Sequence, residues 1–195
     1  MKKTGILIVA IAFISMSFVN LTTSEVEGKL KVDVTNSVIK WKGYKPTGSH
    51  NGTIALLSGE LKMRGNKVKG GFFTVDMPSL KDADASKRLE GHLKSKDFFE
   101  VEVFPTATFK IKSSEEKDSK IYITGSMTIK DVTKEITIPV TVSENEGVIT
   151  LTTETFKINR AEFNIKYKSK SFFNNLKEKF INDEFDLQVT IVASK

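Results

Sequence analysis

The stretch Gly91–Phe109, Gly-His-Leu-Lys-Ser-Lys-Asp-Phe-Phe-Glu-Val-Glu-Val-Phe-Pro-Thr-Ala-Thr-Phe, marks the point where a short helix gives way to strands. Pro105 cannot continue a helix, and it favours extended geometry at the residue before it. Beyond the proline, every second residue from Ala107 to Ile111 is apolar, as in a strand with one buried face. The stretch therefore predicts the end of a helix, a pair of phenylalanines at 98 and 99, and a strand from about residue 106.

Alternating apolar residues predict further strands on both sides of this stretch. Turn residues separate the strands, and Asn51-Gly52 is the strongest hairpin signal among them. The acidic and lysine-rich residues 113–120 are expected to form a solvated hairpin loop, and one or two helical turns are expected between Phe173 and Phe180. The other expected strands span residues 29–44 with an irregularity at 35–37, then 53–63, 68–77, 121–129, 136–142, about 148–159 and 185–191.

A short helix is expected between the third and fourth strands, from about residue 85 to 94. The chain is expected to leave the sheet at Pro78, and Asp82 or Asp84 can cap the helix. Leu89 and Leu93 recur four residues apart, which is a narrow apolar stripe. The helix is therefore expected to lie across an opening of the sheet as a lid or plug.

About eight antiparallel strands joined by short hairpins predict an all-β fold, namely an eight-stranded antiparallel β-barrel with a short helical insertion between strands 3 and 4. At this strand number the interior is either just filled by side chains or holds one small ligand, and closure removes exposed edges. A β-sandwich of the same strands is the alternative, because periodicity alone does not separate the two.

Residues 1–24 are predicted to be a signal peptide and residues 25–195 one domain. Lys2 and Lys3 precede an apolar run from Ile6 to Val19, which is the pattern of a secretory signal. An uncleaved anchor is the alternative, although the run is short for a membrane span. The remaining chain shows no shift of composition and is long enough for one core. We therefore expect a periplasmic or secreted protein of the cell envelope.

Composition excludes several classes of protein. The sequence has no cysteine, which rules out a disulfide framework, a thiolate metal site and a cysteine nucleophile. The formal net charge is +6, but the lysines are spread singly among acidic residues, without the clustered basic groups and interleaved aromatic residues of nucleic-acid-binding proteins. We expect no nucleic-acid partner.

Four segments in a fixed order carry a family resemblance. They are Leu89–Phe99, Phe104–Phe109, Thr124–Lys134 and Lys157–Ile165. Together they resemble the YceI-like lipid/polyisoprenoid-binding family, and the resemblance covers the chain from about residue 31 to 193. It implies an exported, lipocalin-like barrel that holds a long isoprenoid chain in an apolar interior. One departure is Asn164, which stands where the family often has glycine, so the local bend is expected to differ.

The aromatic composition agrees with an apolar ligand. Fourteen phenylalanines against three tyrosines and one tryptophan mean that most aromatic rings lack a polar group. The alternative is that these phenylalanines simply fill the barrel. The candidate lining residues share the apolar side of their strands: Phe73, Val75, Met77, Phe109, Ile111, Ile123, Met127, Ile138, Phe156 and Phe185. The candidates for closing one end are Leu89, Leu93, Phe98 and Phe99.

Polar residues offer few candidates for chemistry. His50 and His92 are the only histidines, and a zinc site built from them would need a carboxylate, so no metal is expected. Asp76 could be a general base, but no second polar residue stands at a spacing typical of a catalytic pair. Arg160 is one of three arginines; it could bind a phosphate or quinone headgroup, or form a structural ion pair. Lysines 166, 168 and 170 would share one face of a strand, either touching anionic lipid or protecting a solvated edge.

The sequence therefore predicts a non-enzymatic binding or carrier protein for an isoprenoid-type lipid, such as a polyprenyl compound or quinone, or for another long apolar molecule. No cofactor is expected. A transient contact with a membrane surface and a homodimer are left open. The alternatives are an enzyme that acts on such a lipid, which needs polar groups converging inside the pocket, and a filled β-sandwich that serves as an interaction module.

Overall fold

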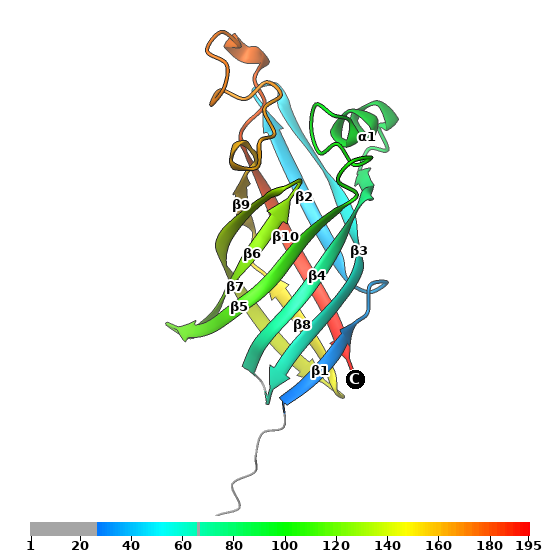
Figure 1. Cartoon of the computed structure of the whole chain (residues 1–195), viewed down its shortest axis with the longest axis vertical. Helices are drawn as coiled ribbons and strands as arrows, with labels where there is room; N and C mark the ends of the chain where they lie inside the picture. The colour runs from blue at the N-terminus through cyan, green and yellow to red at the C-terminus, as the bar shows by residue number, and fades with distance from the viewer. Residues whose placement is uncertain (1–26, 66) are drawn as a thin grey trace, which may run out of the picture.

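A single antiparallel sheet curls round until its two sides meet (Figure 1). The computed structural model describes residues 27–65 and 67–195, so the predicted signal peptide lies outside the described residues. In chain order the elements are β1 (Glu27–Val32), β2 (Val38–Lys45), β3 (Gly48–Arg64), β4 (Lys67–Asp82), α1 (Lys87–Lys94), β5 (Thr106–Lys117), β6 (Lys120–Ile129), β7 (Val132–Asn145), β8 (Val148–Thr153), β9 (Phe156–Asn159), the 3₁₀ turns η1 (Arg160–Phe163) and η2 (Lys177–Lys179), and β10 (Glu184–Ser194).

The last strand, β10, closes the barrel. On one side it pairs with β2, where Val189 is opposite Ile39, and on the other with β8, where Ile191 is opposite Leu151. With the hairpin pairings from β2 through β8, this makes a closed ring of eight strands. The predicted antiparallel barrel is confirmed, and the alternative of a two-layer sandwich is not found.

The two remaining strands extend positions already in the ring. β1 pairs with β3 and β10, the same neighbours as β2, and β9 pairs with β10 as β8 does. The strand expected at 29–44 is thus β1 and β2 in succession. Between them Asp33 accepts hydrogen bonds from the backbone N–H groups of Thr35 and Asn36, at 3.0 and 3.1 Å, which forms the irregularity predicted at 35–37.

The hairpin expected at Asn51-Gly52 is wrong. The turn lies at Pro46-Thr47, and Gly52 sits inside β3, opposite Trp41 on one side and Asp82 on the other. A Cβ atom on Gly52 would lie 1.8 Å from the carbonyl oxygen of Lys81, which accepts a hydrogen bond of 3.1 Å from Trp41 Nε1. This glycine therefore serves a close approach of two strands rather than a turn.

Two other boundaries differ from the prediction. β4 continues past Pro78 to Asp82, because the proline lies at an irregularity in the pairing with β3, where the Ser79 hydroxyl accepts a hydrogen bond from the Ala55 N–H. Residues 113–120 are mostly strand. The loop there is only Asp118-Ser119, both with positive φ, as in the tight turn that matches strand twist.

The helical insertion lies between β4 and β5, at the predicted place and at one end of the barrel (Figure 1). Its N-cap is Ser86, whose hydroxyl accepts a hydrogen bond from the Leu89 N–H, so the expected caps Asp82 and Asp84 are wrong. Leu89 and Leu93 are half-buried and the helix has no fully buried residue, as expected for an element that covers an opening. No helix in the described ranges is long and apolar enough to span a membrane.

The segment between β9 and β10 lies at the same end of the barrel as α1 (Figure 1). It holds only the two 3₁₀ turns, so lysines 166, 168 and 170 do not lie on a strand, and the helix expected near 173–180 is reduced to η2. Asn164 adopts φ 59° and ψ 21° at the end of η1. Asparagine tolerates this left-handed conformation, so the chain turns here without a glycine.

Candidate ligand-binding cavities

Alternate residues of each strand point into the barrel, and the interior is apolar because these residues are almost all apolar. These side chains surround an inner cavity of about 120 Å³, roughly ten times the space that one water molecule needs. Among its lining residues only Thr108 and Thr153 carry a side-chain polar atom, and the Thr153 hydroxyl accepts a hydrogen bond from the Val189 N–H at 2.9 Å. The wall consists of Ile39, Ile54, Leu56, Phe73, Val75, Met77, Phe99, Ala107, Thr108, Phe109, Ile111, Ile123, Met127, Ile129, Ile138, Val140, Leu151, Thr153, Phe156, Phe185, Leu187, Val189 and Ile191.

A glycine shapes part of this wall. A Cβ atom on Gly125 of β6 would lie 2.5 Å from the ring of Phe109 and 2.6 Å from the carbonyl oxygen of Lys110. The Phe109 ring of β5 thus lies against bare backbone. The large side chain of Phe109 on β5 is thus accommodated by the absence of a side chain at Gly125 on β6.

An outer cavity of about 180 Å³ is lined by α1, by β2 and β3, and by the segment that precedes β10. Ile54, Phe99 and Phe185 line both cavities, so these three side chains form the partition between them. The outer wall is more polar than the inner one. It consists of Trp41, Gly43, Tyr44, Lys45, His50, Ile54, Leu80, Leu89, His92, Leu93, Phe98, Phe99, Arg160, Ile181, Asn182 and Phe185.

An aromatic cluster joins the helical insertion to the segment after β9. The His92 ring lies edge-on to Phe98 and Tyr167, with centroids 5.2 and 4.6 Å apart. The guanidinium carbon of Arg160 lies 5.4 Å from the centre of the Phe98 ring, within the range of a cation–π contact. Phe98 is buried whereas Phe99 is half-buried. The two neighbouring phenylalanines therefore have different roles: Phe98 packs the helical insertion against the segment after β9, and Phe99 lines both cavities.

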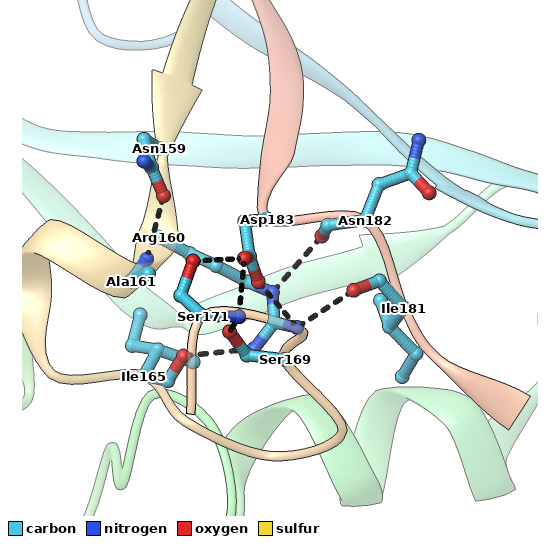
Figure 2. A network of polar contacts seen from close by, with 9 residues as sticks. All are labelled: Asn159, Arg160, Ala161, Ile165, Ser169, Ser171, Ile181, Asn182 and Asp183. Atoms are coloured by element: carbon cyan, nitrogen blue, oxygen red, sulfur yellow. Dashed lines mark hydrogen bonds and ion pairs between the residues drawn. The ribbon is translucent and has the colours of Figure 1, made fainter. Parts of the chain in front are cut away.

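Arg160 holds the chain around the outer cavity together (Figure 2). Its side chain is 3% exposed. Its three nitrogens donate to the carbonyl oxygens of Asn182 (Nε, 3.0 Å), Ile165 (Nη1, 2.8 Å) and Ile181 (Nη2, 2.9 Å), and Nη2 lies 3.3 Å from Asp183 Oδ1. Of the two roles considered for Arg160, the geometry fits the structural one, because the donors of the guanidinium point at backbone oxygens and Asp183.

Asp183 is the anionic partner in this network. Burial alone would raise the pKa of its carboxyl, but hydrogen bonds from Ser169 and Ser171 and the charge of Arg160 outweigh burial and hold this pKa below its ordinary value. Burial lowers the pKa of Arg160, opposed by the charge of Asp183, and arginine stays protonated at such a site. The pair is therefore charged at neutral pH.

The sequence of this chain matches a known protein family. The model of the YceI-like domain matches residues 14–193, which is most of the chain. The chain belongs to the YceI-like domain family. A comparison with curated proteins finds no match.

Solved structures similar to this YceI-like domain share its fold. BcnA of Burkholderia cenocepacia is 23% identical with a TM-score of 0.68, and the match covers 84% of this chain and 99% of that one. A domain of Saccharophagus degradans, described as polyisoprenoid binding, is 12% identical with a TM-score of 0.63 and coverages of 85% and 97%. The YCEI protein of Campylobacter jejuni is 23% identical with a TM-score of 0.53 and coverages of 67% and 74%. At these identities the likeness concerns the fold alone.

The residues predicted from the sequence of this YceI-like domain lie on the walls of the two cavities, and their role in binding stays a prediction. The inner wall contains Phe73, Val75, Met77, Phe99, Phe109, Ile111, Ile123, Met127, Ile138, Phe156 and Phe185. The outer wall contains Leu89, Leu93, Phe98 and Arg160, together with Phe99 and Phe185. The prediction left out the rest of the inner wall. The missed residues on β2, β3, β8 and β10 are Ile39, Ile54, Leu56, Leu151, Thr153, Leu187, Val189 and Ile191, and those on β5, β6 and β7 are Ala107, Thr108, Ile129 and Val140. The alternation of the apolar residues among them was visible and could have found those.

The polar groups that could revive the enzyme alternative do not converge on one point in the described residues. His50 and Arg160 both line the outer cavity of the YceI-like domain, but Asp76 lines neither cavity. The donors of Arg160 are engaged by carbonyl oxygens. Tyr44 donates to Asp186 Oδ2, and this hydrogen bond, with burial and the charge of Asp186, raises the pKa of Tyr44. Tyr44 is thus less available as a base than a free tyrosine.

Proposed function

We propose that this protein is an exported, non-enzymatic carrier that holds an isoprenoid-type lipid in its barrel. The observation that carries the proposal is the inner cavity, which is enclosed by a closed ring of strands and walled almost entirely by hydrocarbon. A wall of this kind offers no charged partner for a polar ligand, and desolvating polar groups there would be costly. A polyprenyl compound, an isoprenoid quinone or another long apolar molecule fits this chemistry.

The shape of the space favours a chain over a bulky ligand. The inner and outer cavities measure about 120 and 180 Å³ and share three lining residues, so a flexible chain could pass the partition and occupy both. Each buried isoprene unit would contribute on the order of 3 kcal/mol before the ordering of the ligand is subtracted. The polyisoprenoid binding described for the Saccharophagus degradans domain supports the same choice of ligand.

Two further parts of the proposal rest on sequence patterns and on the wall of the cavity. Among the described residues, no ionisable side chain lines the inner cavity, which favours binding over catalysis. Lys2, Lys3 and the apolar run that follows them favour export to the periplasm or the exterior. Separating the proteins of the native cell into cytoplasmic and envelope fractions tests the second point, since the carrier is expected in the envelope.

The ligand itself can be identified in protein purified gently from its native host. We expect organic extracts of this sample to contain an isoprenoid lipid at close to one molecule per chain by mass spectrometry. The same extraction after denaturing and refolding serves as the control and should contain none. If the native sample repeatedly contained no apolar molecule, the carrier proposal would be wrong. The native mass of the sample also tests whether the protein forms a homodimer, which the sequence leaves open.

We further propose that the end of the barrel bearing the outer cavity contacts an anionic membrane while ligand is exchanged. Residues 166–182, here called the lysine segment, contain five lysines and one glutamate. The segment also exposes Phe172 and Phe173, at 42% and 49%, and contributes Ile181 and Asn182 to the outer cavity. Lysines near anionic lipid contribute about 1 kcal/mol each, and exposed phenylalanines can insert at the boundary between headgroups and acyl chains.

Reversing charge on the lysine segment should therefore weaken membrane binding. With Lys166→Glu and Lys170→Glu combined, we expect binding to vesicles of phosphatidylglycerol to fall by about 30-fold or more in sedimentation assays, and phosphatidylcholine vesicles to bind weakly throughout. Lys62→Glu with Lys69→Glu is the matched control, because these exposed lysines lie near the end of β3 and the start of β4. The end of β3 is at the opposite end of the barrel from α1 (Figure 1). Equal losses in both double variants would indicate a general effect of charge and contradict the proposed contact surface.

A further inference from the structure

Three metal-ligating side chains meet beside the outer cavity. His50 lies near the start of β3, Asp82 ends β4, and Asp84 lies in the turn that leads to α1. One potential ligand atom from each residue falls within 4.8 Å of the other two. His50 Nδ1 is 3.8 Å from Asp82 Oδ1. The pairing of Gly52 with Asp82 brings the two strands together here, so the fold itself assembles the cluster.

Two atoms of this cluster are buried without a hydrogen-bond partner. The Asp82 side chain is 1% exposed. Its Oδ2 accepts from the Ser86 N–H at 3.1 Å, whereas its Oδ1, which faces His50, accepts no hydrogen bond. His50 Nδ1 is also buried and unpartnered. Leaving such atoms unpaired is costly, and native proteins rarely do so. A group bound between them would satisfy both atoms.

We propose that His50, Asp82 and Asp84 bind a divalent transition-metal ion of the Zn²⁺ type. One imidazole nitrogen and two carboxylate oxygens form a mixed donor set, which suits Zn²⁺ better than the oxygen-only preference of Mg²⁺ or Ca²⁺. With bonds of about 2.0–2.2 Å, ligand atoms around zinc lie roughly 3.4 Å apart. Small movements of Asp84, which is exposed, and of His50, whose side chain is 37% exposed, close the difference. Water would complete the coordination.

The ion would connect the helical insertion to the rim of the barrel. His50 lines the outer cavity, and Asp82 and Asp84 stand directly before the helix that covers this cavity. The Asp82 N–H already donates to Glu90 Oε1 of that helix at 3.1 Å. A bound metal would add a second connection, from β3, and so stiffen the cover. The proposed ion does not require the lipid, because Asp82 and Asp84 line neither cavity and His50 lines only the outer one.

The molecule contains its own control for an ordinary histidine–aspartate contact. His92 Nδ1 lies 3.9 Å from Asp97 Oδ2, almost the same distance as in the His50–Asp82 pair. Among the described residues, His50, Asp82 and Asp84 form the one group with three potential ligands. A metal should therefore distinguish the two histidines, whereas a simple ion pair or non-specific binding of metal to histidine should not.

Titration of Zn²⁺ into the metal-stripped full chain tests the proposal by calorimetry, with thermal unfolding as a second readout. We expect one ion per chain and an unfolding midpoint that rises with Zn²⁺ concentration, while Mg²⁺ and Ca²⁺ have little effect. Asp82→Asn keeps an acceptor for the Ser86 N–H and should weaken binding at least about 100-fold. His50→Gln and the exposed variant Asp84→Asn should also weaken it, whereas His92→Gln should match the parent.

Two results would contradict the proposed metal site. Absence of a stoichiometric Zn²⁺ site in the folded parent would overturn the proposal. So would equal losses in His50→Gln and His92→Gln, which would indicate adventitious binding to histidine. Should Asp82→Asn fail to fold, Asp84→Asn decides alone, because its side chain lies on the surface and accepts no hydrogen bond that the fold needs. Full affinity in that variant would contradict the three-ligand site.

Discussion

Replacing Ala107 by phenylalanine should abolish the proposed isoprenoid binding without unfolding the barrel. Ala107 lies on β5, opposite Val75, and lines the inner cavity. An apolar cavity of roughly 150 Å³ holds one benzene molecule, so a phenyl ring added at Ala107 would fill most of the 120 Å³ present here. We expect affinity for geranylgeraniol to fall at least about 100-fold. The unfolding free energy should change by no more than the roughly 1–3 kcal/mol seen on overpacking.

Ala55→Phe is the matched control for this prediction. Ala55 is an alanine on β3 with its side chain exposed on the outside of the barrel, so the same added ring should leave affinity unchanged. Displacement of a fluorescent polyene lipid by geranylgeraniol measures binding, and urea unfolding of each variant measures stability. If Ala107→Phe folded and still bound with parental affinity, the ligand would not occupy the inner cavity, and the proposed location of the lipid would be wrong.

The barrel could be predicted because its strands repeat a simple pattern. Alternation in β6, from Ile121 to Ile129, and in β10 is a local property that depends on which face is buried. Closure is not local. It depends on β10 pairing with β2 at one edge and with β8 at the other. In the strand pattern, only the number of strands indicated a closed barrel. The resemblance of four sequence segments to the YceI-like family predicts the same barrel.

Errors arose where a residue serves a distant contact rather than its neighbours. Asn51-Gly52 carries the composition of a turn, yet Gly52 is required because Lys81, far along the chain, lies against it. Aspartate is a common helix cap, so Asp82 was expected to cap α1. The helix begins after Ser86 instead, and the Asp82 carboxylate accepts a hydrogen bond from the Ser86 N–H. Local propensity cannot identify such uses, because the partner is fixed by strand register.

The two candidate sites differ in how far they could be predicted. Cavity-facing residues such as Phe73 and Phe109 follow from parity alone, since every second residue of a barrel strand points inward. The cluster of His50 with Asp82 and Asp84 could not be predicted, and no metal was expected. Bringing these residues together requires the register of β3 against β4, in which Gly52 is opposite Asp82. Sequence spacing gives no sign of that register.

Replacing Arg160 by methionine should cause a large loss of stability. The variant leaves the carbonyl oxygens of Ile165, Ile181 and Asn182 without their donors and removes the charge next to Asp183. Breaking a buried pair by removing one partner costs about 3–5 kcal/mol. We expect the unfolding free energy in urea to fall by that amount, and the thermal midpoint by roughly 6–20 °C. Because natural domains have about 5–15 kcal/mol in total, the variant should still fold.

Arg88→Met is the control, since Arg88 is exposed on α1 and a surface change of this kind costs within about 0.5 kcal/mol. Both variants should be compared at pH 7. The lowered pKa of Asp183 means that its contribution is fully present above the unfolded value of about 3.9 and is lost as the pH falls through the lower folded value. The opposite result would be parental stability in Arg160→Met together with a loss of affinity for a phosphorylated polyprenyl lipid but not for the unphosphorylated one. Arg160 would then be a headgroup ligand rather than the residue that holds the end of the barrel together.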